Sequence, residues 1–113
     1  MTSRIYGISH EFAADGIKQQ TVQNDFVGFI EEFELSGSSY DLGGYFYIEK
    51  PDGTKVYPFE SNILRGSVKL NNLSMPLDIG DKIVFSLQSY DAANGAIGNI
   101  NVVVNTDYNI YRQ

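Results

Sequence analysis

The residues that could do acid–base or metal chemistry are few, and the first group surrounds the only histidine. His10 is followed directly by Glu11, and Asp15 lies five residues beyond the histidine. A divalent metal site needs two or three nitrogen or carboxylate ligands that converge, whereas this group offers one imidazole in a stretch that we expect to be a loop. No nucleophile elbow accompanies the serines and aspartates of the chain. We therefore predict no catalytic residue and no metal ligand.

A second acidic group, Glu31, Glu32 and Glu34, invites comparison with the paired carboxylates of glycoside hydrolases. On a strand, Glu32 and Glu34 share one face about 7 Å apart, which is twice the rise per residue. That spacing arises in any acidic strand, and a chain of 113 residues without tryptophan makes a poor cleft for a sugar chain. We therefore predict that the protein is not an enzyme.

The segment from Tyr90 to Asn99 is the best candidate for a ligand site, because it places oxygen ligands and two glycines between two predicted strands. Calcium takes six to eight oxygens, of which Asp91, Asn94 and Asn99 would supply some, and Tyr90 could stack on a sugar. Tyr90-Asp91 followed by Asn99 resembles the calcium-binding loop of bacterial jelly-roll lectins, which implies a calcium-dependent glycan-binding module. A hairpin with Asn94-Gly95 at its turn explains the same residues without a ligand, and we favour it.

Tyrosine is frequent, with eight copies and no tryptophan, so much of the aromatic surface carries a hydroxyl group. Such residues are enriched in protein interfaces. Both ends of the chain also carry β-branched and aromatic residues, where free termini are usually polar, and terminal strands can add to the sheet edge of a neighbour. The predicted interface residues are Ile5, Tyr6, Ile8, Tyr45, Tyr47, Tyr57, Tyr108, Ile110 and Tyr111.

Length and charge narrow the class of partner. The 113 residues suit one domain, residues 1–113, and the absence of cysteine excludes disulfides and thiolate metal sites. A formal charge of −6, with the eight basic residues scattered, disfavours nucleic acid and anionic membranes. No run of about 18 apolar residues would span a membrane. We predict a protein partner and no cofactor, and we favour a virion or extracellular location.

Turn-prone clusters recur at short intervals along the chain, and apolar residues alternate with polar ones between them, which is typical of strands. The pattern is clearest over 83–88 and 100–105, each predicted to have one wet face. A hairpin is predicted from 43–50 and 55–59 around the turn Pro51-Asp52-Gly53-Thr54. Weaker strands are expected over 4–8, 17–23, 66–70 and 108–112.

The stretch Phe26 to Leu35 is ambiguous, because Phe26, Ile30 and Phe33 also satisfy helical spacing. We predict a strand, since Gly28 weakens a helix and aromatic and β-branched residues dominate the first half. In that strand the residues that share one face at period two are Val27, Phe29, Phe33 and Leu35.

Eight or nine strands without a sustained helix predict an all-β, antiparallel β-sandwich. A jelly roll is favoured over an immunoglobulin-like topology, which usually has a cysteine pair and a core tryptophan. The first functional hypothesis is a non-enzymatic structural or assembly protein, such as a virion, tail or appendage subunit. It would pack against copies of itself or a scaffold through terminal strands and tyrosine-rich surface. The alternative is a carbohydrate-binding module or lectin, with calcium possible, using Tyr90 to Asn99.

Overall fold

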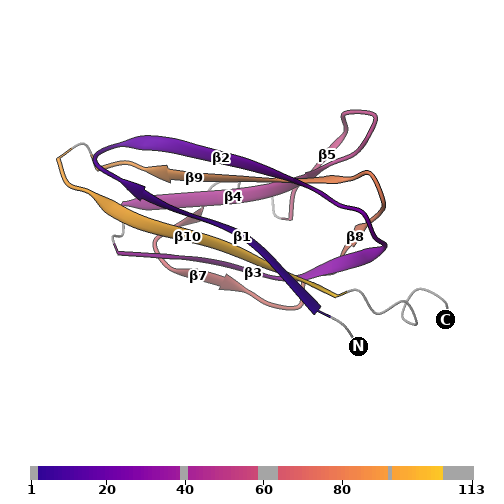
Figure 1. The fold of residues 1–113 in the computed structure, drawn as a ribbon. Helices are drawn as coiled ribbons and strands as arrows, with labels where there is room; N and C mark the ends of the chain where they lie inside the picture. Colours follow the sequence, from indigo (N-terminus) through magenta and orange to yellow (C-terminus); the bar gives the residue numbers. More distant parts are fainter. Residues whose placement is uncertain (1–2, 39–40, 59–63, 92, 106–113) are drawn as a thin grey trace.

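Two antiparallel sheets packed face to face form the molecule (Figure 1). The computed structural model describes residues 3–38, 41–58, 64–91 and 93–105. Sheet A has the order β1 (Ser3–Phe12), β10 (Ala96–Asn105) and β3 (Gly28–Gly37), and β3 then pairs with both β7 (Val68–Leu70) and β8 (Met75–Leu77). Sheet B has the order β2 (Gly16–Gln23), β9 (Lys82–Ser89) and β4 (Leu42–Glu49), and β4 pairs with both β5 (Lys55–Val56) and β6 (Leu64–Arg65).

The predicted all-β sandwich is therefore confirmed, with ten strands in the described residues rather than eight or nine. The jelly roll stays a prediction. The short strands β6 and β8 were not predicted from the sequence, and the possible strand over 108–112 lies outside the described residues. In the described part of the chain, no helix is long and apolar enough to cross a membrane.

The stretch Phe26 to Leu35 is a strand, as predicted, but its faces differ from the prediction because β3 contains a bulge. Val103 of β10 pairs with Glu32 and Val104 pairs with Ile30, so Glu31 is the extra residue. A bulge shifts the period-two alternation by one position. Ile30 therefore joins Phe33 and Leu35 in the core, whereas Val27 and Phe29 are only partly buried. The single face predicted for Val27, Phe29, Phe33 and Leu35 is wrong.

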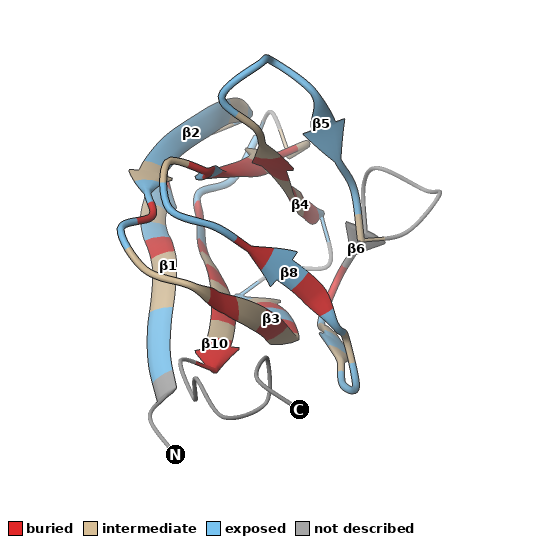
Figure 2. Ribbon diagram, turned by 90° about the vertical axis from the view of Figure 1, so that its right-hand side faces the viewer, coloured by how far each residue is buried: buried red, intermediate tan, exposed pale blue. Residues whose placement is uncertain are grey.

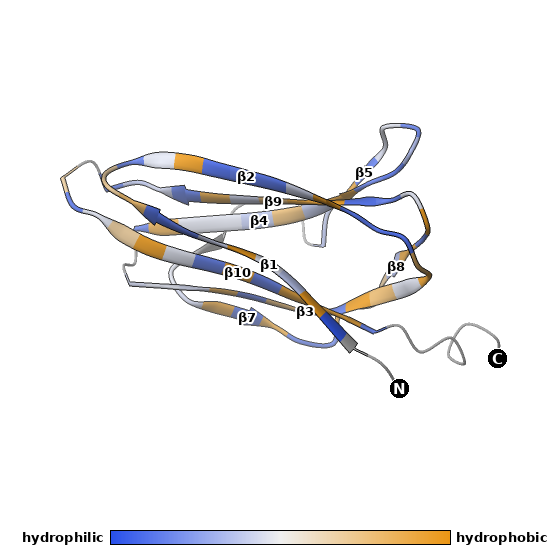
Figure 3. Ribbon diagram, viewed as in Figure 1, coloured by the Kyte–Doolittle hydropathy of each residue, from blue (hydrophilic) through white to orange (hydrophobic). Residues whose placement is uncertain are grey.

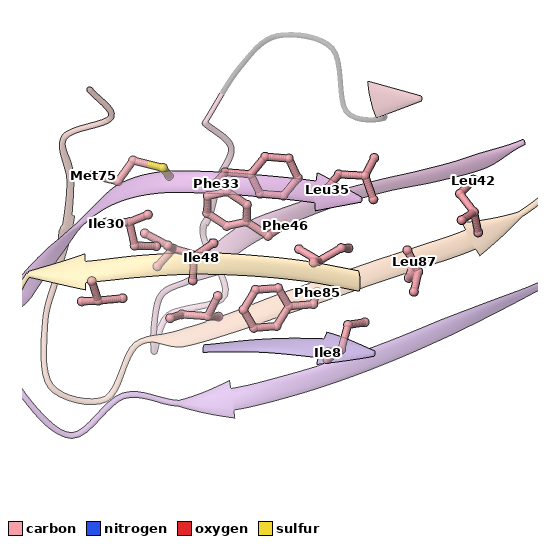
Figure 4. Packing of buried hydrophobic residues seen from close by; sticks show 14 of the residues in the cluster. Ile8, Ile30, Phe33, Leu35, Leu42, Phe46, Ile48, Met75, Phe85 and Leu87 are labelled. Carbon is pink, nitrogen blue, oxygen red and sulfur yellow. The ribbon is translucent and has the colours of Figure 1, made fainter. Parts of the chain in front are cut away.

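The core lies between the two sheets, and aromatic rings connect them (Figure 4). Phe33 of sheet A stacks on Phe46 of sheet B with ring centroids 5.3 Å apart, and Phe46 lies 6.4 Å from Phe85. All three side chains are fully buried, and Ile100 and Val102 of β10 are buried with them. Burial of this apolar surface is the main force that holds the sheets together.

Strand β9 is more deeply buried than its sequence predicts. Its inward residues Ile83, Phe85 and Leu87 are buried as expected, but the outward residues Val84 and Ser86 are also buried, at 7% and 5% exposure. The prediction of one wet face is therefore wrong for β9. Val84 and Ser86 pair across the sheet with two tyrosines of β4, whose side chains lie on the same outer face.

The connection from β9 to β10 joins the two sheets, because β9 belongs to sheet B and β10 to sheet A. The predicted hairpin around Asn94-Gly95 is therefore wrong. The hairpin between β4 and β5 is present, with Gly53 at φ +92° and hydrogen bonds from Lys50 N–H to the Thr54 carbonyl (2.8 Å) and from Gly53 N–H to the Lys50 carbonyl (2.9 Å). Turn chemistry thus predicts a reversal of the chain, but it does not say which sheet the next strand enters.

A partly buried ion pair links the end of β4 to the turn before β9. The Lys50 ammonium lies 2.8 Å from an Asp81 carboxylate oxygen, which also accepts the Asp78 N–H at 2.8 Å. The buried Asn24 joins the same turn, because its N–H donates to the Asp81 carbonyl and its side-chain amide donates to the Asp78 carbonyl. Three segments that are distant in sequence are held together here.

Candidate interaction site

A row of tyrosines lies on the outer face of sheet B, and we call it the tyrosine face: Tyr45, Tyr47 and Tyr57, with Lys55. Leu42, Phe46 and Ile48 of β4 point into the core, so Tyr45 and Tyr47 point outward. Their rings lie 6.3 Å apart and nearly parallel, at 19°, which follows from their two-residue separation along one strand. Tyr57, just after β5, brings its ring to 5.2 Å from that of Tyr47.

The electrostatics of the tyrosine face differ from those of the whole chain. The Lys55 ammonium lies 5.2 Å from the centroid of the Tyr47 ring, a cation–π contact. Partial burial raises the pKa of Tyr47 above its ordinary value, and the positive charge of Lys55 acts in the opposite direction. Glu49 pairs in register with both Lys55 and Lys82, so this face has no surplus of acid although the chain carries −6.

A second candidate surface is the side of the sandwich where β1 and β2 are the last strands of their sheets, which we call the open side (Figure 2). In the described residues, β1 pairs only with β10, and β2 pairs only with β9. Each of these edge strands exposes one isoleucine, Ile5 at 70% and Ile17 at 63%. Ile17 was not selected from the sequence, although this apolar residue directly precedes three polar ones. Much of β2 is hydrophilic (Figure 3).

The other predicted interface residues of β1 face the core. Ile8 is 6% exposed and belongs to the hydrophobic cluster, and Tyr6 is partly buried with its ring 6.4 Å from that of Phe26. Arg4 covers the same Phe26 ring at 4.4 Å and lies 3.7 Å from the Asp25 carboxylate. Ile5 therefore carries most of the outward apolar surface of β1. The predicted interface residues Tyr108, Ile110 and Tyr111 lie outside the described residues.

The histidine lies in strand β1, and the prediction of a loop there is wrong. Its imidazole packs edge-on against the Phe12 ring, with centroids 4.6 Å apart. Neighbouring residues of a strand point to opposite faces, so His10 and Glu11 are directed apart. Within the described residues, no group of three or more His, Cys, Asp or Glu side chains could hold a metal ion.

The predicted ligand segment uses its carboxylate to hold its own turn. One Asp91 oxygen accepts the N–H groups of Ala93 (2.9 Å) and Asn94 (3.1 Å), and the other accepts the Asn94 side-chain amide at 3.2 Å. These bonds, led by that from Ala93, lower the pKa of Asp91. Asn99 lies apart from this turn, on β10, where it pairs with Ser9 and Ser36. The calcium-dependent lectin stays a prediction.

The bulge in β3 places Glu31 and Glu32 together at the rim of an open hollow of about 550 Å³, which Asn71, Asn72 and Leu73 complete. The Glu31 carboxylate accepts a hydrogen bond from the Asn105 amide at 3.1 Å, and the Glu32 carboxylate lies 3.9 Å from the Lys69 ammonium. Glu32 and Glu34 share the outer face of sheet A, as predicted. Because Glu31 and Glu32 each have a partner within the fold, this hollow is a solvated acidic surface rather than a site with an evident reaction.

Comparison with known proteins gives a fold likeness only. No family model matches the chain, and no curated protein matches its sequence. Among solved structures, the periplasmic inhibitor of g-type lysozyme from Aeromonas hydrophila is similar at 11% identity and a TM-score of 0.47, over 89% of this chain and 86% of that one. A chain of infectious bursal disease virus, Gt strain, is similar at 14% identity and a TM-score of 0.41, over 89% of this chain but 33% of its own. The Drosophila NLP core is similar at 12% identity and a TM-score of 0.36, over 90% of this chain and 96% of that one.

Proposed function

We propose that the protein is a non-enzymatic assembly subunit that packs against copies of itself. The observation that carries this proposal is the tyrosine face. Three tyrosine rings from β4 and the segment after β5 lie together on one outer face, where Tyr57 is 38% exposed and Tyr45 and Tyr47 are partly exposed. Tyrosine brings contact area at low conformational cost and keeps a hydrogen-bonding group, which suits it to protein interfaces.

Charge supports association through this face rather than through the outer face of sheet A. Two copies of a chain with charge −6 repel each other, but the acidic surplus is absent where Glu49 is matched by Lys55 and Lys82. Sheet A instead exposes Glu32 and Glu34 beside the single cation of Lys69. Copies that meet at their tyrosine faces therefore repel each other less than copies that meet at the outer faces of sheet A.

Light scattering over a range of protein concentrations tests this proposal. The wild type should associate as its concentration rises, and replacing Tyr45, Tyr47 and Tyr57 by serine should reduce that association. Tyr90→Ser is the matched control, because it makes the same change outside the tyrosine face. Wild-type protein that stays monomeric at every concentration, or serine variants that associate as the wild type does, would contradict the proposal.

A further inference from the structure

The two sides of the sandwich end differently. On one side, each sheet ends in a pair of short strands: β7 and β8 have three residues each, and β5 and β6 have two each. Proline at position 76 lies within β8, and lysine lies in both β5 and β7. Short edge strands, proline and lysine are the means by which proteins prevent strand addition. This side is protected against pairing with another chain.

On the open side, the two edges differ from each other. Strand β1 pairs with β10 over ten residues in unbroken register and contains neither proline nor a bulge. Strand β2 carries Lys18 opposite Leu87, a residue that points into the core, so this lysine is on the inward side of its sheet. An inward-pointing charge on an edge strand opposes the addition of another strand. Strand β1 carries Arg4 in the same way, opposite the buried Val104, but the Arg4 guanidinium lies 4.4 Å from the Phe26 ring and 3.7 Å from the Asp25 carboxylate. Because this charge is held by partners within its own sandwich, β1 is the less defended open edge, and it also exposes Ile5 at 70%.

We propose that two copies of the chain form a closed dimer in which the β1 edges pair antiparallel across a two-fold axis and extend sheet A from five strands to ten. This inference is independent of the tyrosine face, on which the proposed function rests. Because β1 is the less defended of the two open edges in the described residues, strand addition there consumes it in both copies and ends at a dimer.

Charge and size both agree with a second copy as the occupant. Strands β1 and β2 together carry two basic residues, Arg4 and Lys18, against one acidic residue, Glu11, although the whole chain carries −6. The ten residues of β1 extend over about 33 Å. The two sheets lie about 10 Å apart, and the side chains on their outer faces bring the width of the open side to about 20 Å. With a length of about 33 Å, the open side therefore covers roughly 650 Å² per copy. The total of about 1,300 Å² reaches the size of a specific interface.

The first test is Ile5→Lys, with Ile17→Lys as the matched control on the other open edge. Ile5 lines a shallow hollow together with Glu32 and Glu34, so the fold should accept a lysine there, which circular dichroism would confirm. Ile5→Lys should weaken dimerisation about a hundredfold, because both copies lose the isoleucine contact and gain a like charge. Ile17→Lys makes the same chemical change at 63% exposure and should weaken the dimer far less, because Ile17 lies on β2, which forms no strand pairing in the proposed dimer. Sedimentation measures both.

A second test uses the absence of native cysteine. In an antiparallel pair, opposite residues share a face and bring their Cα atoms to about 5 Å, within reach of a disulfide. A mixture of Ile5→Cys with either Ser9→Cys or Glu11→Cys should therefore cross-link on mild oxidation, depending on whether Gly7 or Ile8 lies on the axis. The mixture of Ile5→Cys with Ile17→Cys should not.

The results separate this inference from the proposed function. Three results would overturn the β1 pairing. The wild type is monomeric, or the dimer persists when Ile5→Lys is combined with serine at Tyr45, Tyr47 and Tyr57, or the dimer is lost equally in Ile17→Lys. Cross-links absent from both β1 mixtures would overturn it as well. Assemblies that depend on the tyrosines but not on Ile5 would leave the proposed function standing alone. A dimer that depends on Ile5 and never grows would leave only the β1 pairing.

Discussion

The substitution Asp81→Asn should lower the free energy of unfolding by about 2 kcal/mol. The Asp81 carboxylate is 2% exposed and accepts bonds from the Lys50 ammonium and the Asp78 N–H, both at 2.8 Å. Removing one partner of a fully buried ion pair costs about 3–5 kcal/mol. The Lys50 side chain is 29% exposed and regains part of its hydration, and an asparagine still accepts the Asp78 N–H. These two effects reduce the expected loss to about 2 kcal/mol.

Asp78→Asn is a stringent control, because Asp78 lies near the same ammonium. Its carboxylate is 3.8 Å from the Lys50 nitrogen and 68% exposed, so its removal should cost less than about 0.5 kcal/mol. Urea unfolding gives both values from the midpoint and slope of the transition. The double variant Asp81→Asn with Lys50→Met should lose about 1–2 kcal/mol less than the sum of the single losses. A loss below about 0.5 kcal/mol for Asp81→Asn, or equal losses at positions 78 and 81, would refute the reasoning.

Three further substitutions test the core and the loop. Phe46→Ala should lower the free energy of unfolding by about 3–5 kcal/mol in urea, because the ring is fully buried between Phe33 and Phe85, and a loss below about 2 kcal/mol would contradict that packing. Gly44→Ala should cost about 1–3 kcal/mol by thermal unfolding, since a Cβ there would lie 2.8 Å from the Ile100 Cδ1 atom, and an unchanged midpoint would show that the Ile100 side chain moves aside without cost. The lowered pKa of Asp91 means that its contribution to stability is present above its unfolded pKa of about 3.9 and is lost as pH falls through the folded pKa. Asp91→Asn should therefore be less stable than the wild type at pH 7 and converge with it once the pH falls below the lowered pKa of the folded protein, whereas a difference that persists in stronger acid would contradict this role.

Periodicity was sufficient to predict the long strands, because each has one face in a continuous core. Periodicity did not predict the burial of residues that are covered or shifted by an adjacent strand. The inward and outward positions of β3 change places at Glu31, because Val103 of β10 pairs with Glu32 and Val104 pairs with Ile30. No local pattern in residues 26–35 indicates this bulge. Val84 and Ser86 are buried beside Tyr47 and Tyr45, their cross-strand partners, which lie about forty residues earlier in the chain. Strands of two or three residues, such as β6 and β8, are too short for any period to be visible.

The candidate surfaces were predictable to different degrees for a similar reason. Residue type alone picked out Tyr45, Tyr47 and Tyr57, and a strand period of two then places Tyr45 and Tyr47 on one face. For β1, residue type picked out Ile5, Tyr6 and Ile8 together, although only Ile5 is largely exposed. The sequence does not show which strand ends a sheet. That property depends on the order β1-β10-β3 and β2-β9-β4, which is decided by pairings between distant segments.

The packing of the tyrosine face limits how strongly it could bind by itself. The Tyr45 and Tyr47 rings already stack on each other, and their side chains already cover Val84 and Ser86, so little apolar area is left to bury on association. Contacts through ring edges and hydroxyl groups add modest affinity per subunit. If β1 pairing first joins two copies, each dimer presents two tyrosine faces, and a second weak contact becomes intramolecular with a much higher effective concentration. Losing Ile5 should then weaken the larger assembly more than the tyrosine contacts alone predict.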